Sequence, residues 1–309
     1  MNYNPLVSVI MNCCNGEAYL REAVDSVLSQ SYKNWEIIFW DNCSKDKSVE
    51  IIQSYKDKRI KCFKAQEFTA LGKARNLAIE KSRGEIIAFL DVDDIWYKEK
   101  LLLQVEVFIK KESVGIVVTD TIFFDKDGDQ RQLYSSIKPK EGNVFRALLK
   151  RYDLSLETVA IRRKHLDLLV EWFDVRFDMI EEAELLIRLS KKCELAYIDK
   201  VLAKWRMHDD SWTFSKYEKF PVERELMIEK FCKLYPNFED EYSDECMELR
   251  KAIAKERALL GWKKSDLREA RAFLRPYLGD RKMLIYFLLT FLPKSIYDKI
   301  QQLRGFKPI

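Results

Sequence analysis

Residues 85–94 read EIIAFLDVDD, and the rest of the chain is organised around them. The first six residues are mostly apolar, which is typical of a strand buried on both faces of a sheet. The run then ends in Asp91, Asp93 and Asp94. Three carboxylates packed together repel one another unless a cation or hydrogen-bond donors offset their charge. The pattern therefore predicts a divalent metal site at the carboxyl end of a strand. The alternative is that Asp93 or Asp94 caps a helix starting near Trp96.

Strands and helices alternate on either side of this stretch. Apolar runs of strand length occur at residues 6–11, 35–40, 59–64 and 85–90, separated by segments of helical periodicity. Such alternation predicts an α/β fold with a mainly parallel sheet flanked by helices on both faces. Ligands of such sheets bind at the carboxyl ends of the strands. Polar residues follow the strands at 12–15, 41–44 and 91–94, so we expect these turns to share one rim.

The glycine-rich loops that commonly bind phosphate are missing from the sequence. No GxGxxG follows the first strand, and GxxxxGK[ST] occurs nowhere. A metal ion is therefore the expected holder of any phosphate.

Composition narrows the class of protein. The chain has 309 residues, 47% of them hydrophobic, which is enough for one large or two modest domains. Its net charge of +4 is too weak to argue for a nucleic-acid partner. Seven cysteines at irregular positions show neither zinc-like spacing nor a disulfide framework, which favours a reducing cytoplasm. The N-terminus lacks the features of a signal peptide, and no apolar run reaches the roughly 18 residues that span a bilayer.

Two polar clusters lie further along the chain. Glu181 and Glu182 open a segment whose leucines have helical spacing, and the helix dipole alone would favour acids there. Arg206 and His208 stand two residues apart, so they project the same way from an extended segment. That spacing suits an anionic diphosphate or its metal, although a lone histidine is more often structural.

Taken together, these motifs resemble the family 2 glycosyltransferases over roughly residues 5 to 212. Each motif alone is weak, but six in this order and at these distances make the match specific. The motifs are VSVIMNCCN at 7–15, DNCS at 41–44, GKARN at 72–76, GEIIAFLDVDD at 84–94, Glu181-Glu182, and RMH at 206–208.

The resemblance implies a Rossmann-like GT-A fold, a nucleotide-sugar donor, a bound Mg²⁺ or Mn²⁺, and inversion at the anomeric carbon. By position, Asp93 corresponds to the direct metal ligand, with Asp91 beside it toward the metal or ribose and His208 as a further ligand. The catalytic base corresponds to Glu182, preceded by Glu181. The matching nucleotide-sugar-binding positions are Asn12, Asp41, Asn42, Arg75, Asp91 and Arg206.

Three positions depart from the family pattern. Cys14 stands where a tyrosine often stacks on the base, and Asn42 replaces the second acid of the usual pair. The amide of Asn42 is still able to accept a hydrogen bond from a pyrimidine N3–H. Glu182 replaces an aspartate and is one methylene longer, which shifts the acceptor position or the backbone by about an ångström.

The expected domains are a glycosyltransferase domain at 1–215 and a helical region at 216–309. Within the first, residues 1–115 form the nucleotide-sugar half and residues 116–215 the acceptor and catalytic half. Residues 281–307 combine an apolar run with flanking cations. This segment suits peripheral contact with a membrane interface, or equally a helix docked on the protein's own core.

The leading prediction is a metal-dependent inverting glycosyltransferase, cytoplasmic or peripheral at the inner face of the cell membrane. It would move a sugar, from a UDP-sugar by expectation, to a hydroxyl of a glycan or polyprenyl-linked acceptor in bacterial surface-polysaccharide synthesis. The alternatives are an inactive GT-A scaffold that binds sugar, and a nucleotidyltransferase. The missing lysine-bearing N-terminal loop speaks against the latter.

Overall fold

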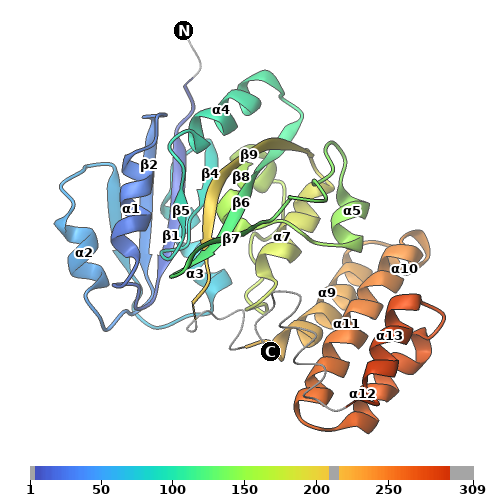
Figure 1. Ribbon diagram of the computed structural model, residues 1–309. Coiled ribbons are helices and arrows are strands. Elements are labelled where there is room, and N and C mark those ends of the chain that lie inside the picture. Colours follow the sequence, from blue (N-terminus) through green and yellow to red (C-terminus); the bar gives the residue numbers. More distant parts are fainter. Residues whose placement is uncertain (1–3, 209–215, 293–309) are drawn as a thin grey trace. The chain divides into compact units, whose positions relative to one another are not determined.

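The computed structural model describes residues 4–208 and 216–292 (Figure 1). The chain divides into two compact units. The first holds Met1–Leu148 and Tyr152–His208, and the second holds Leu149–Arg151 and Asp209–Ile309.

Four parallel strands form one half of the sheet in the first unit. They are β1 (Val7–Cys13), β2 (Trp35–Asp41), β3 (Ile60–Lys64) and β4 (Ile86–Phe89), in the order β3-β2-β1-β4. Every residue of β1, β2 and β4 is buried, as expected for strands covered on both faces. The connecting helices are α1 (Leu20–Leu28), α2 (Ser48–Ser54) and α3 (Leu71–Lys81). The predicted alternation and the α/β class are confirmed.

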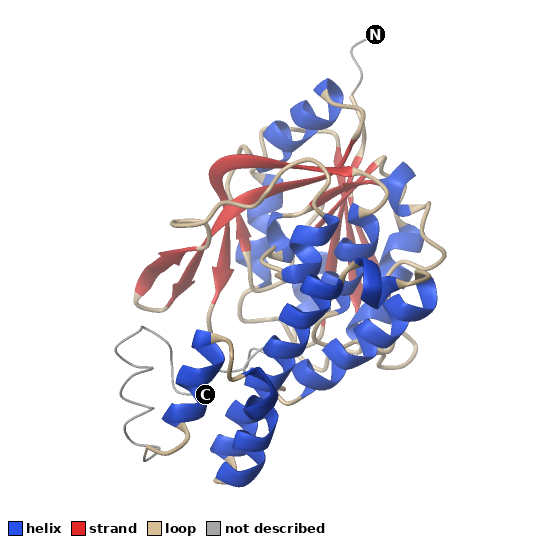
Figure 2. Ribbon diagram, turned by 90° about the vertical axis from the view of Figure 1, so that its right-hand side faces the viewer, coloured by secondary structure: helices blue, strands red, loops and turns tan. Residues whose placement is uncertain are grey.

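The remaining strands turn the sheet into a mixed one, which twists when seen from the side (Figure 2). β8 (Ala160–Arg162) is antiparallel to β4 and to β6 (Val114–Asp125). β9 (Glu194–Arg206) runs parallel to β6, and β7 (Gly128–Gln132) forms a hairpin with β6. The full order is β3-β2-β1-β4-β8-β6-β9-β5, where β5 is Ile95–Trp96.

The region after the aspartates differs from expectation. The helix predicted from Trp96 begins only at Lys100, as α4 (Lys100–Lys110), because Ile95 and Trp96 pair with β9 instead. The N-cap of α4 is Glu99, so the alternative that Asp93 or Asp94 caps this helix is wrong. The acids of residues 91–94 lie in a turn between two strands.

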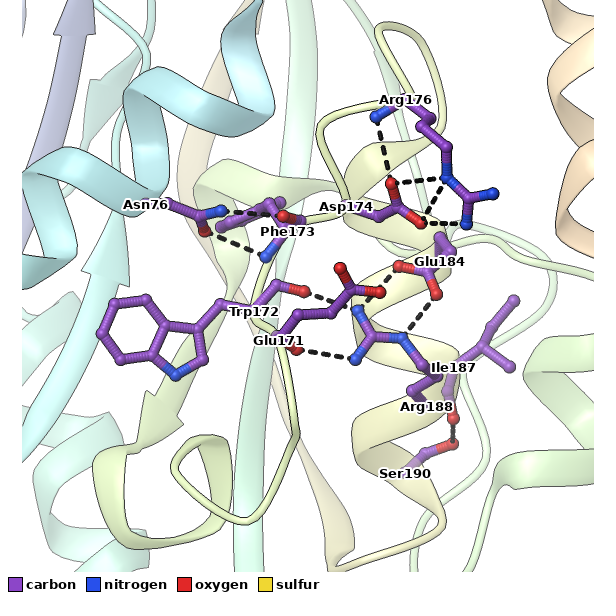
Figure 3. A network of polar contacts seen from close by, with 10 residues as sticks. All are labelled: Asn76, Glu171, Trp172, Phe173, Asp174, Arg176, Glu184, Ile187, Arg188 and Ser190. Carbon is purple, nitrogen blue, oxygen red and sulfur yellow. Dashed lines mark hydrogen bonds and ion pairs between the residues drawn. The ribbon is translucent and has the colours of Figure 1, made fainter. Parts of the chain in front are cut away.

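Helix α7 (Glu181–Ser190) is held to the unit by a polar network (Figure 3). Arg188 forms a buried ion pair with Glu184 one turn earlier and donates to the carbonyl oxygens of Glu171 and Trp172. Asn76 of α3 exchanges two hydrogen bonds with the backbone of Phe173, at 2.7 and 3.0 Å. The segment before α7 is therefore fastened to both helices, and this fixes where α7 begins. The short helices of this region are α5 (Phe145–Lys150), η1 (Leu156–Thr158) and α6 (Arg163–Leu166).

The second unit is helical, as predicted. Its described elements are α9 (Lys219–Leu234), α10 (Phe238–Glu241), α11 (Ser243–Lys263), α12 (Leu267–Leu274), η2 (Arg275–Tyr277) and α13 (Arg281–Leu289). α11 and α12 form a helical hairpin, and Gly261 lets α12 approach closely, because a Cβ there would lie 3.2 Å from the backbone nitrogen of Ala270. Within residues 4–208 and 216–292, no helix combines the length and apolar character needed to cross a bilayer.

Candidate active site

Three polar turns meet at the carboxyl ends of β1, β2 and β4. The amide of Asn42 donates to the carbonyl of Cys13 at 2.7 Å, joining the turns after β2 and β1. Gly16 lies so close to the turn after β4 that a Cβ would approach Val92 Cγ2 to 2.7 Å. The structure thus brings the turns at 12–15, 41–44 and 91–94 to one edge of the sheet.

The side chains that follow β1 and β2 differ in how they are engaged. Asp41 is buried and accepts from the Ser44 amide at 3.0 Å. Asn42 is occupied by Thr69: its oxygen accepts from the Thr69 amide at 3.1 Å and its nitrogen donates to the Thr69 carbonyl at 2.8 Å. The Thr69 hydroxyl takes the second acceptor position of Asn42 at 3.2 Å, so Asn42 positions the segment before α3. Asn12 is buried, and the described chain offers no hydrogen-bond acceptor to its side-chain nitrogen.

Arg75 of α3 joins the acids of two distant motifs. Its guanidinium is buried, forms an ion pair with Glu181 and donates to Asp91 at 3.2 Å. Although burial alone would lower the pKa of Arg75, the carboxylates of Asp91 and Glu181 raise it. Arg75 was predicted to support the nucleotide, and the structure places its donors on these two acids of its own chain. We call Arg75, Asp91 and Glu181 the ion triad.

Glu182 is the neighbouring acid, and its environment is different. Its side chain is half-buried, and within residues 4–208 no hydrogen bond or ion pair engages its carboxylate. Burial and the negative charge of Glu181 raise the pKa of Glu182 to about 8, with Arg75 opposing the shift. A carboxylate whose pKa lies near neutrality and whose oxygens are uncommitted suits a general base.

The end of β9 docks onto the turn that carries Asp93 and Asp94. The Arg206 amide donates to Asp94 at 2.9 Å, and its Nε donates to the Asp93 carbonyl at 2.8 Å. The Arg206 guanidinium lies 4.4 Å from the ring centroids of both Tyr19 and Phe124. Arg206 therefore fixes the backbone of the aspartate turn, and His208 follows two residues later.

Asp93 and His208 form the part of the site that fits a metal ion. Asp93 Oδ2 and His208 Nε2 are 2.9 Å apart, and both side chains are partly exposed. Two adjacent ligands of an octahedral ion at 2.1 Å lie about 3.0 Å apart, so this spacing matches one edge of the coordination sphere. Within the described residues, no group of three or more His, Cys, Asp or Glu side chains is arranged to hold a metal. The other ligands would come from a diphosphate and water, which is how Mg²⁺ is usually held.

Asp94 is buried in the interior and is not exposed at the rim. It is 2% exposed, and burial together with the charge of Asp93 raises its pKa well above the usual range. The three carboxylates of the motif therefore have three different settings: Asp91 on Arg75, Asp93 on His208, and Asp94 on the Arg206 amide.

Two residues near the acids escaped the sequence analysis. Glu157 is buried in η1 and accepts from the Ser155 hydroxyl at 2.6 Å, and burial raises its pKa. The Tyr152 hydroxyl is buried without a hydrogen-bond partner in the described chain, and burial and the charge of Glu182 raise its pKa. An acid inside the apolar run 154–161 was an available signal for Glu157; nothing local marks Tyr152.

The sequence matches the family model "Glycosyl transferase family 2" over residues 8–169. TuaG of Bacillus subtilis, named as a teichuronic acid biosynthesis glycosyltransferase, is 33% identical over 220 residues, covering 70% of this chain and 85% of that protein. WfaP of Escherichia coli, a UDP-Glc:alpha-D-GlcNAc-diphosphoundecaprenol beta-1,3-glucosyltransferase, is 31% identical over 217 residues, covering 69% and 82%.

Solved structures share the fold. Residues 1–349 of TarS from S. aureus, in complex with UDP-GlcNAc, superpose with a TM-score of 0.61 at 16% identity, covering 88% of this chain and 91% of that one. The mannosyltransferase PcManGT from Pyrobaculum calidifontis, in complex with GDP-Man and Mn²⁺, gives 0.60 at 16% identity, covering 98% and 88%. With the matched motifs lining one rim of such a sheet, the chain belongs to glycosyltransferase family 2 and is a glycosyltransferase of GT-A fold.

Proposed function

We propose that the chain is a metal-dependent inverting glycosyltransferase that moves a sugar from a UDP-sugar to a hydroxyl of a lipid-linked glycan. The observation that carries this proposal is the pair of differently held acids: Asp93 beside His208, and an uncommitted Glu182 whose pKa is raised to about 8. The name of WfaP supports a UDP-sugar and an undecaprenyl diphosphate-linked acceptor. We place the reaction at the inner face of the cell membrane, where such an acceptor would be anchored.

In this proposal the residues act on separate parts of one displacement. Asp93 and His208 would hold Mg²⁺ or Mn²⁺, which neutralises charge on the leaving diphosphate. Glu182 accepts the proton of the acceptor hydroxyl as its oxygen bonds to the anomeric carbon. The bond from that carbon to the diphosphate breaks, and the diphosphate leaves with the electron pair. A single displacement inverts the configuration.

The ion triad has a supporting role in the same proposal. Arg75 pairs with Glu181 and Asp91, and the charge of Glu181 adds to burial in raising the pKa of its neighbour Glu182. Asp41 and Asn12 are proposed to face the nucleoside, with Asn42 supporting them through Thr69. We also propose that residues 1–115 form the nucleotide-sugar half of the glycosyltransferase domain and that residues 116–215 form its acceptor and catalytic half.

Donor binding tests the proposal first. UDP-, GDP-, dTDP- and CMP-sugars are added with and without Mn²⁺, and thermal unfolding is followed. A UDP-sugar with Mn²⁺ is expected to stabilise the wild type, by about 2.7 kcal/mol when present at 100 times its Kd. Asp93→Ala should lose this shift, because it removes a metal ligand. Asp57→Ala is the matched control, since the Asp57 carboxylate pairs with its neighbour Arg59 and is not among the proposed metal ligands.

Two outcomes would contradict the proposal. A shift in unfolding temperature that is the same without metal and persists in Asp93→Ala would rule out the proposed metal site. No shift with any sugar nucleotide would favour the inactive sugar-binding scaffold.

The pH dependence of transfer follows from Glu182. A general base works only when deprotonated, so kcat/KM for the donor should rise with pH up to the Glu182 pKa of about 8 and then level off. Below that pKa the rate should fall by about tenfold per pH unit. Donor affinity, measured over the same range by calorimetry, is the control and should change less with pH than the rate does. A transfer rate that does not change between about pH 7 and 9 would be evidence against Glu182 as the base.

A further inference from the structure

Helix α13 and the two turn residues after Thr290 present an apolar face to solvent. The face lies opposite the buried residues Met283 and Thr290. Its members are Leu284, Ile285, Leu288, Phe291 and Leu292, which are 38, 47, 56, 59 and 38% exposed. Their spacing of one, three or four residues places them on one side of a helix. We call these five residues the outer face of α13.

The opposite side of α13 is already docked. Met283 packs in a cluster with Ala254, Ala258, Ala270 and Leu274, and Tyr286 and Phe287 pack against that cluster. Asp280 caps the helix by accepting from the amides of Lys282 and Met283. The contact with the protein's own core therefore accounts for Met283, Tyr286 and Phe287, and it leaves the outer face without a partner within the cluster.

Among the described residues, Arg271, Arg281 and Lys282 place positive charge next to the outer face. Arg281 and Lys282 open the helix and are exposed. Arg271 lies 3.9 Å from the Phe291 ring centroid and donates to Thr290 Oγ1 and O at 3.0 Å each, which sets a positive charge beside the outer face. An apolar helical face bordered by cations matches the interface of an anionic bilayer, where apolar side chains enter the acyl boundary and cations meet the headgroups.

We propose that the outer face of α13 binds the surface of an anionic phospholipid bilayer, with the helix lying in the interface. A helix of nine residues is about 13.5 Å long, which is too short to span but suits an interfacial element. This inference deepens the proposed lipid-linked acceptor, because it brings the enzyme to the surface that holds such a substrate. Its test uses neither donor nor acceptor, so its failure is distinguishable from failure of the proposed reaction.

The test is flotation of the full chain with vesicles of phosphatidylcholine alone or with about 30% phosphatidylglycerol. Wild type is expected to bind the anionic vesicles and to be released by added salt. The double variant Ile285→Glu with Leu288→Glu should bind at least about tenfold more weakly, because it places two charges in the apolar face. The control is Val222→Glu with Met247→Glu, which adds the same charge at side chains 58 and 45% exposed in the same unit.

Equal loss in the control, or no binding of wild type to anionic vesicles, would overturn the proposal. Ile285→Ala with Leu288→Ala keeps helix propensity and charge, so its weaker binding would exclude unfolding as the cause. Sedimentation velocity without lipid tests the alternative that a second copy of the chain covers the outer face. A wild-type dimer that Ile285→Glu with Leu288→Glu dissociates, without any change in flotation, would assign the face to a second copy of the chain.

Discussion

Replacing Glu182 with glutamine is expected to lower sugar transfer by about 10² or more while leaving donor binding intact. The amide cannot take the acceptor proton, and it has nearly the shape of the carboxylate. Turnover with saturating donor, and donor affinity by calorimetry, measure the two effects separately.

The same substitution should raise the stability of the fold. The pKa of Glu182 is about 8 in the folded chain and near the ordinary 4.3 when unfolded, so the folded state binds more protons between these values. Stability contributed by this group is therefore complete below about pH 4 and is lost as pH rises toward 8. Glutamine carries no charge, so thermal unfolding at pH 8 should shift upward. Loss of activity through misfolding would shift it downward.

Glu181→Gln is the informative comparison. Glu181 is committed to Arg75, so its loss should reduce stability more than it reduces the rate per folded molecule. Near-normal turnover of Glu182→Gln, together with a large loss in Glu181→Gln, would transfer the role of base to Glu181.

Replacing Arg75 with methionine is expected to lower the free energy of unfolding by about 3–5 kcal/mol. The substitution leaves two acids, the buried Glu181 and the partly exposed Asp91, without the cation that they share. Urea denaturation followed by circular dichroism measures the change. Lys110→Met is the control, because Lys110 is 71% exposed and pairs with the exposed Glu106, where such surface pairs contribute about 1 kcal/mol or less.

A second substitution separates charge from packing in this prediction. Adding Glu181→Leu to Arg75→Met removes one uncompensated carboxylate and should recover part of the loss. A double variant no more stable than Arg75→Met would mean that the guanidinium acts through packing rather than through its charge.

The first half of the fold was readable from the sequence because its signals are local. The strands at 6–11 and 85–90 are mostly apolar runs, and their polar turns mark the ends that meet at the rim. The start of α4 was not readable, because Ile95 and Trp96 form β5 only by pairing with residues of β9 more than a hundred positions later.

The same limit applies to the candidate site. Residue types and spacing identified the acids, but their division of roles depends on Arg75 and His208, which reach Glu181 and Asp93 across 106 and 115 positions. Asn42 was expected to face the nucleotide. In the structure, both the oxygen and the nitrogen of its side-chain amide form hydrogen bonds with Thr69. In the tail, an apolar run predicted a membrane contact or a docked helix, and α13 has one side docked and the other exposed.

The ion triad also constrains how relatives could be recombined. Arg75 and Asp91 precede residue 115, and Glu181 follows it. A chimera that takes residues 1–115 from one enzyme and the residues that follow from another inherits Arg75 and Glu181 from different parents. Such an exchange is expected to lose stability unless both parents carry the matching charges, so the triad is a compatibility rule for joining these two segments.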